Sequence, residues 1–251
     1  MDRYEHYTVR GLVLSERTVG DWDKSLDLLC EGIGLVHAWA RGAKRTNSPL
    51  LTASTLFSYG SYTLRMSESR TTIQQAETIE AFLPLRKSVQ TLALASYVLE
   101  LSKYFCAEEQ QEDELLRLTL NTLYAVAQDT WSHVQIKACF ELRALSITGY
   151  APTLHACMSC GEETVAFFSF RKKGLLCASC VGSEEGAMQL DRATIAAMRY
   201  IDTAELSRIM SFSIGEKQCE LLSAICERYA LETIEHVPPT LSFYRQVKTK
   251  A

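Results

Sequence analysis

Cys157-Met158-Ser159-Cys160 and Cys177-Ala178-Ser179-Cys180 are the stretches around which this chain is organised. Sixteen residues separate them, and two Cys-x-x-Cys pairs at this distance have the spacing of a four-thiolate zinc site. Each pair places two sulfurs on one tight turn, and two such turns complete a tetrahedron around the metal. The spacing predicts one Zn²⁺ held by Cys157, Cys160, Cys177 and Cys180. An iron–sulfur cluster, a redox dithiol pair and accidental spacing are the alternatives.

The residues between the two pairs support a small metal module. Residues 167–170 read as a strand, residues 171–174 as a turn and residues 175–176 as a returning strand. All four ligand positions are thiolates, whereas a catalytic zinc keeps one position open. The His-x-Glu of zinc deaminases is absent, because His155 is followed by Ala156 and Cys157. We therefore expect a structural zinc, with His155 exposed in a loop; His155 in place of one cysteine is the alternative.

Length and composition are those of an ordinary globular protein. The chain of 251 residues is long enough for two domains, each with a buried core. Hydrophobic residues make up 47% and charged residues 22%, which is typical of soluble proteins. Because the formal net charge is -4, a nucleic-acid-binding surface would have to be a local patch.

The number of cysteines and the N-terminal sequence indicate the cellular compartment of the protein. No apolar run follows a basic head at the start, so we expect no signal peptide, and the longest apolar stretches are too short to cross a bilayer. Nine cysteines without an export signal indicate a reducing compartment, and their odd number argues against a complete disulfide framework. We expect a cytoplasmic protein without membrane contact. The cysteines outside the metal module are expected to be buried free thiols: Cys30, Cys106, Cys139, Cys219 and Cys226.

Alternating hydrophobicity before residue 80 gives way to helical periodicity after it. The first region predicts five strands, at residues 7–14, 25–30, 35–40, 57–65 and 72–76. Five short strands in this length suit a Greek-key barrel of the OB type, with an SH3-like barrel or a half-sandwich as alternatives. From Phe82 onward a period near 3.6 predicts helices at residues 89–104, 115–126, 134–145, 191–201 and 216–229.

Glycine, proline and capping residues indicate where several helices begin or end. Gly149 and Pro152 are expected to end the third helix, and Asp191 is a plausible N-cap for the fourth. Pro238-Pro239 is expected to break the last helix before a short tail. The predicted fold class is α+β: an N-terminal five-stranded OB-type β-barrel over residues 1–80, then an α-helical domain over residues 81–251. The four-cysteine zinc module is inserted in that domain at about residues 152–188.

A basic loop follows the third predicted strand. Residues 41–49 read Arg-Gly-Ala-Lys-Arg-Thr-Asn-Ser-Pro, and residues 32–75 hold five basic residues against one acidic residue, Glu68. The basic residues are Arg41, Lys44, Arg45, Arg65 and Arg70. Cations beside exposed aromatics suit single-stranded nucleic acid, since phosphates pair with the cations and bases stack on the rings. The candidate aromatics are Trp39, Tyr59 and Tyr62. The alternative is a solvated loop with these aromatics in the barrel core.

Signals of catalysis are missing. No Gly-x-x-x-x-Gly-Lys-Ser/Thr phosphate loop occurs, and the Gly-x-Gly at Gly32 lacks its third glycine because His37 stands there. The five histidines are scattered, away from any serine-nucleophile motif or carboxylate pair. We therefore expect a protein that is not an enzyme. Arg171-Lys172-Lys173, at the predicted hairpin turn, is either a phosphate contact or a solubilising turn.

Taken together, this pattern resembles the RecO family of bacterial recombination mediators over essentially the whole chain. The resemblance is most specific at residues 34–45, at Gln75-Ala76-Glu77, and at residues 149–152 leading into the two cysteine pairs. Two positions depart from the family pattern: Leu35 stands where a lysine is common, and Lys173-Gly174 replaces a glycine pair. The missing lysine removes one expected cation. Because some family members lack the cysteines, the resemblance implies that zinc stabilises the fold and is not the activity itself.

The resemblance implies a DNA-repair mediator without catalytic turnover, associated with the nucleoid. Such proteins bind single- and double-stranded DNA and anneal complementary strands coated with single-strand-binding protein. With RecR they help RecA to displace this coat, and they contact the coat protein through its C-terminal tail, which docks on the helical domain. In this chain the expected phosphate contacts are Arg41, Lys44 and Arg45, followed by Arg65 and Arg70. A zinc-stabilised protein-interaction adaptor without DNA binding is the alternative, and a metal-dependent enzyme is a third.

Overall fold

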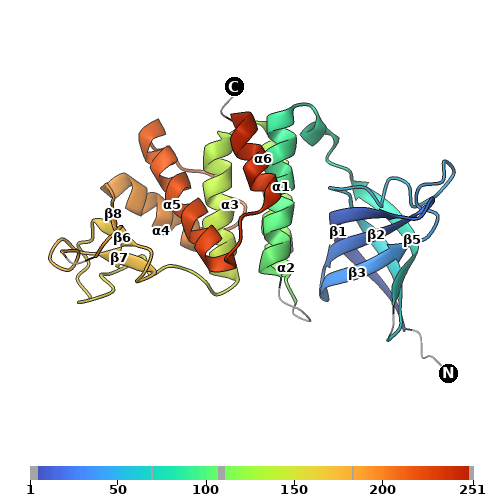
Figure 1. The fold of residues 1–251 in the computed structure, drawn as a ribbon, viewed down its shortest axis with the longest axis horizontal. Coiled ribbons are helices and arrows are strands. Elements are labelled where there is room, and N and C mark those ends of the chain that lie inside the picture. Colours follow the sequence, from blue (N-terminus) through green and yellow to red (C-terminus); the bar gives the residue numbers. More distant parts are fainter. Residues whose placement is uncertain (1–4, 69, 107–110, 183, 249–251) are drawn as a thin grey trace. The chain divides into compact units, whose positions relative to one another are not determined.

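In a computed structural model of the chain, residues 5–68, 70–106, 111–182 and 184–248 are described (Figure 1). The chain divides into two compact units. The barrel unit comprises the residues up to Gln128 together with those from Pro238 onward, and the cysteine unit comprises Asp129–Val237. None of the described helices has the length and apolar character of a membrane span.

The barrel unit begins with five strands that close into a barrel in the order β1-β2-β3-β5-β4. They are β1 (Glu5–Val19), β2 (Asp23–Cys30), β3 (Gly34–Ala40), β4 (Tyr59–Met66) and β5 (Thr71–Glu80). Neighbouring strands are antiparallel except β3 and β5, which pair in parallel at Ala38–Thr71 and Trp39–Thr72. The structure confirms the predicted five-stranded barrel, and its closed Greek-key order fits the OB type.

Alternation along the strands fills the barrel with apolar side chains. On β3, Val36, Ala38 and Ala40 are buried, while His37 points outward. On β4, a Cβ added at Gly60 would lie 2.4 Å from the backbone carbonyl oxygen of Glu77 on β5. Only glycine permits this close approach of two strands.

Asp27 on β2 joins the barrel to the first helix of the barrel unit. Its carboxylate accepts hydrogen bonds from Ser15 Oγ at 2.5 Å and from Lys103 Nζ at 2.5 Å, and it pairs with His37. Burial alone would raise the pKa of Asp27, but the hydrogen bonds from Lys103, Ser15 and His37 outweigh it and lower this pKa below 3.8. The ionised carboxylate is therefore the form that stabilises this junction.

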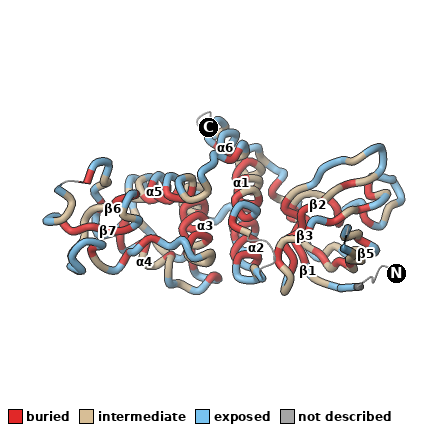
Figure 2. Tube along the Cα trace, turned by 60° about the horizontal axis from the view of Figure 1, so that its bottom comes forward, coloured by how far each residue is buried: buried red, intermediate tan, exposed pale blue. Residues whose placement is uncertain are grey.

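The remaining elements of the barrel unit are helical: η1 (Leu83–Arg86), α1 (Val89–Phe105), α2 (Asp113–Gln128) and α6 (Pro239–Lys248). The tail predicted after Pro238 is wrong, because these residues form α6. Pro239 occupies the first helical position, where its missing N–H is not needed. Leu241 and Tyr244 of α6 are buried, and Thr240 donates its backbone N–H to Glu100 of α1 at 3.1 Å. Figure 2 shows the buried residues of α1 and α2 in red.

The cysteine unit packs three helices with a small sheet. The helices are α3 (His133–Ile147), α4 (Arg192–Thr203) and α5 (Glu216–Ile234), and the strands are β6 (Phe167–Ser169), β7 (Gly174–Leu176) and β8 (Met188–Gln189). After α3 the N–H of Tyr150 bonds to Leu145 O and that of Gly149 to Ser146 O. With Gly149 at φ +82°, this is the glycine-terminated helix end that the sequence predicts. The predicted cap is also confirmed, since Asp191 accepts the N–H of Thr194 at 2.8 Å.

Candidate nucleic-acid interface and candidate metal centre

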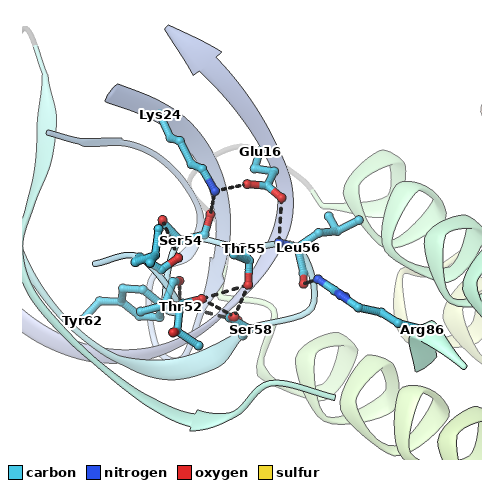
Figure 3. Close-up of polar contacts among 11 residues, drawn as sticks. Glu16, Lys24, Thr52, Ser54, Thr55, Leu56, Ser58, Tyr62 and Arg86 are labelled. Atoms are coloured by element: carbon cyan, nitrogen blue, oxygen red, sulfur yellow. Dashed lines mark hydrogen bonds and ion pairs between the residues drawn. The ribbon is translucent and has the colours of Figure 1, made fainter. Parts of the chain in front are cut away.

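The long connection between β3 and β4, residues 41–58, is tied down at its second half (Figure 3). Lys24 Nζ donates to the carbonyl of Ser54 at 3.0 Å and pairs with the carboxylate of Glu16. The other oxygen of Glu16 accepts the N–H of Leu56 at 3.2 Å, and Arg86 donates to the Leu56 carbonyl at 3.1 Å. Side chains from β1, β2 and η1 thus satisfy the backbone of a connection that has no regular strand of its own.

Tyr62 fixes the same connection from inside the barrel. Its hydroxyl donates to the carbonyl of Ala53 at 2.8 Å, and Ser58 Oγ donates to Thr52 O at 2.7 Å (Figure 3). Of the two alternatives for Tyr62, an exposed aromatic or a ring in the barrel core, the structure shows the second: the residue is 0% exposed, and burial raises its pKa. β4 alternates inward and outward, and Tyr62 falls on the inward register with Leu64.

The basic loop, residues 41–49, is anchored by Asp23 at the start of β2. The carboxylate of Asp23 accepts the backbone N–H of Gly42 at 2.8 Å and Nε1 of Trp39 at 3.0 Å. These two hydrogen bonds, followed by the charges of Arg41 and Arg45, lower the pKa of Asp23. The carboxylate of Asp23 is therefore ionised. It holds the backbone of the basic loop at Gly42, close enough for the charges of Arg41 and Arg45 to act on it. No motif in the sequence points to Asp23, because its partners lie 16 and 19 residues away along the chain.

The structure brings the predicted basic residues to one end of the barrel. Arg41 and Arg65 line a groove of about 400 Å³ with Ser48, Pro49, Leu50, Thr72, Ile73 and Gln74. The guanidinium of Arg70 lies 4.7 Å from the centre of the Trp39 ring, and Trp39 is paired with Thr72. Lys44 and Arg45 are exposed on the basic loop. This groove offers guanidinium groups, hydroxyls and an amide, a donor set that suits an anionic backbone.

Trp39 and Tyr59, the other aromatics predicted to be exposed, are both half-buried. One face of Trp39 is covered by Arg70 and its nitrogen is bound to Asp23. Neither ring is as exposed to solvent as stacking of a nucleic-acid base on it would require. Trp39 serves instead to link Asp23 and Arg70.

The four predicted metal ligands meet in the cysteine unit. The sulfurs of Cys157, Cys160, Cys177 and Cys180 all lie within 4.8 Å of one another. Sγ of Cys160 and Sγ of Cys177 are 3.7 Å apart. Four thiolates around a zinc at about 2.3 Å would place their sulfurs about 3.8 Å apart, so this cluster fits a tetrahedral metal ion. His155 is exposed and is not among the clustered ligands, as predicted.

Short backbone turns present these sulfurs. Gly161 donates its N–H to Cys157 O at 2.9 Å, and Cys180 donates to Cys177 O at 3.2 Å. Burial raises the pKa of Cys157, but N–H groups including those of Cys177 and Ser159 outweigh it and lower the pKa to about 6. Its hydrogen bonds to Cys160 and Cys177 raise the pKa of Cys180 to about 12. A bound divalent cation would favour ionisation of all four thiols, because the metal ligand is the thiolate.

The hairpin that carries the second cysteine pair is held by contacts within the module. Glu184 accepts from Arg171 Nη2 at 2.6 Å and from Ser169 Oγ at 2.6 Å, and these bonds lower the pKa of Glu184 to about 2. Lys172 Nζ donates to Ser159 Oγ at 3.0 Å. Two of the three cations at the hairpin turn are thus engaged inside the module, which favours a structural role for them.

Comparison with known proteins relates the whole chain to one family. The family model "Recombination protein O N terminal" matches residues 1–82, and "Recombination protein O C terminal" matches residues 86–242. The chain belongs to the RecO family. A DNA repair protein RecO of Acetivibrio thermocellus is 30% identical over 237 residues, which is 94% of this chain and 94% of the relative.

Two further relatives carry the same name. The Symbiobacterium thermophilum protein is 32% identical over 225 residues, 87% of this chain and 89% of its own. The Desulforudis audaxviator protein is 30% identical over 245 residues, 97% of this chain and 98% of its own. These RecO proteins are named for DNA repair and not for a catalysed reaction. Family membership therefore places the chain among DNA repair and recombination proteins.

Proposed function

We propose that this RecO-family chain is a recombination mediator that binds single- and double-stranded DNA and anneals complementary strands. Together with RecR, it promotes loading of RecA onto DNA coated with single-strand-binding protein. The observation that carries the proposal is the gathering of basic side chains at one end of an OB-type barrel, in a chain whose net charge is -4. A local cationic surface on an otherwise acidic protein attracts an anionic partner to that place.

Each basic residue has a place in this proposal. Arg41 lines the groove together with Arg65, and Lys44 and Arg45 extend the cationic surface along the basic loop. We assign phosphate contacts first to Arg41, Lys44 and Arg45, then to Arg65 and Arg70. Residues 1–80 would then act as the DNA-binding domain, with Asp23 anchoring the basic loop and with Lys24 and Glu16 holding the connection that follows it.

We propose Zn²⁺ as the ion of the four-cysteine cluster, with a structural role. The sulfur spacing fits a tetrahedral site, and all four positions are filled by thiolates, which leaves none for a substrate. Within residues 152–188 the strands are only two or three residues long. The metal would therefore supply folding energy that so short a sheet lacks.

Partner contacts follow from the family. We propose that the C-terminal tail of single-strand-binding protein docks on the helical part of the chain, residues 81–251, and that RecR joins the complex before RecA is loaded. Docking of the tail would bring the mediator to coated strands, where its cations can neutralise phosphates of two strands at once.

The test is annealing of complementary single strands precoated with single-strand-binding protein. We expect acceleration by this chain, and no acceleration when the coat protein lacks its C-terminal tail. Acceleration that survives removal of the tail would contradict the docking contact but not the annealing. Absence of both annealing and low-salt DNA binding would overturn the proposal in favour of the protein-interaction adaptor.

A further inference from the structure

Trp22 is an exposed tryptophan in the turn between β1 and β2. The residue is 53% exposed. Within the described part of the chain, its side chain makes no hydrogen bond and no ring contact. Gly20 starts the turn with φ +60°. A tryptophan that is half exposed leaves apolar ring surface in water, and tryptophan is enriched among the residues that dominate binding surfaces.

The turn that carries Trp22 is fastened to the basic loop. The carbonyl oxygen of Trp22 accepts the N–H of Lys44 at 3.0 Å. The next residue, Asp23, accepts the N–H of Gly42 at 2.8 Å, and the charges of Arg41 and Arg45 act on its carboxylate. Two consecutive residues therefore connect the turn to the loop, so the backbone of Trp22 is held next to the basic loop and its exposed ring belongs to the same end of the barrel.

The other aromatics near the basic loop are already engaged. Trp39 is bound to Asp23 and covered by Arg70, and Tyr62 is inside the barrel. An open aromatic face next to phosphate-binding cations suits a nucleotide with an unpaired base, because the base can stack while its phosphate pairs with a cation. In duplex DNA the bases are already stacked on one another and do not present a free face.

We infer that Trp22 is a stacking platform for an unpaired base of single-stranded DNA, and that it gives the barrel a preference for single strands over duplex. This inference rests on the proposed DNA binding. It assigns the phosphates to the basic loop and one base to the β1–β2 turn. Stacking on one aromatic side chain corresponds to about a 5- to 150-fold gain in affinity.

The experiment compares Trp22→Ala and Trp22→Phe with the wild type, using oligo(dT) and a duplex of equal length. Tyr124→Ala on α2, another exposed aromatic at 62% exposure, is the matched control. We expect Trp22→Ala to bind oligo(dT) about 5- to 150-fold more weakly while its duplex affinity stays unchanged. Trp22→Phe should keep most of the affinity, and the control should match the wild type. Oligo(dT) should also quench the tryptophan fluorescence of the wild type more than that of Trp22→Phe.

The outcomes separate this inference from the proposed function. Wild-type binding to oligo(dT) with an unchanged affinity in Trp22→Ala overturns the stacking role alone. An equal loss for oligo(dT) and duplex overturns the preference for single strands. Failure of the wild type to bind either DNA at low salt overturns the proposed DNA binding, and the inference with it.

Discussion

Replacing Lys137 with methionine should destabilise the cysteine unit severely. Lys137 on α3 is 2% exposed at its side chain and forms ion pairs of 2.7 Å with Glu141 on the same helix and with Glu227 on α5. The side chain of Glu141 is 0% exposed, whereas that of Glu227 is 21% exposed. Removing the cation leaves the Glu141 carboxylate buried without this charge partner, while water can hydrate Glu227. Breaking a buried pair in this way costs about 3–5 kcal/mol.

Urea denaturation followed by circular dichroism measures this cost. At roughly 1–3 kcal/mol per molar urea, the midpoint of Lys137→Met should fall by at least about 1 M. The double variant Lys137→Met/Glu141→Leu should recover most of the loss, because apolar replacement of a buried pair is often neutral. Glu232→Gln removes an exposed ion pair on α5 and should change stability by less than about 1 kcal/mol. If Lys137→Met behaves like Glu232→Gln, or if the double variant is worse than the single one, the reasoning is refuted.

Three other predictions test separate parts of the structure. Because folding lowers the pKa of Asp27, its ionised carboxylate contributes fully to the free energy of unfolding above about pH 4, and this contribution is lost as the pH falls through the lowered pKa. In urea denaturation, the loss of stability caused by Asp27→Asn should therefore be largest at pH 7 and smaller at pH 3. Cys157→Ser/Cys160→Ser should lose bound zinc by elemental analysis and melt at a lower temperature, yet keep the wild-type affinity for DNA; an unchanged melting temperature, with no metal in the wild type, would contradict the zinc site. Gly60→Ala should destabilise the barrel, since its Cβ would meet a backbone carbonyl at 2.4 Å, while Gly182→Ala, which meets nothing within 4 Å, should melt like the wild type.

Local patterns in the sequence predict most of the architecture. Alternation locates the five strands, and the cysteine spacing locates a cluster whose sulfurs do meet. The tail after Pro238 was mispredicted because Pro-Pro reads as a break, although Pro239 fits the first turn of α6 and packing of Leu241 and Tyr244 stabilises that helix. Features set by residues close together in the sequence, such as strands and cysteine pairs, can therefore be predicted from it. The start of a helix such as α6 also depends on tertiary packing.

The candidate interface was only partly predictable for the same reason. Arg41 and Arg65 are visible as cations, but their shared groove depends on strand order and on the fold of residues 41–58. Trp22 looks like an ordinary turn residue until its carbonyl is seen bound to Lys44. Tyr62 fits both an exposed and a buried position in the sequence, and its burial in the barrel together with its hydrogen bond to Ala53 decides between them. The groove, the place of Trp22 and the burial of Tyr62 all depend on contacts between residues far apart in the sequence, which the sequence alone does not reveal.

The most direct test of DNA binding by the basic end of the barrel is the salt dependence of the affinity for single-stranded DNA. It should be measured for the wild type, for Arg41→Gln/Lys44→Gln/Arg45→Gln, and for the charge-matched control Arg192→Gln/Arg208→Gln/Lys217→Gln. The control changes three exposed cations of the cysteine unit. With about 0.7 released counterions per phosphate, the loop variant should flatten the slope of log K against log salt by about two units, while the control keeps the wild-type slope. An unchanged slope in the loop variant would contradict the account and place the DNA surface elsewhere.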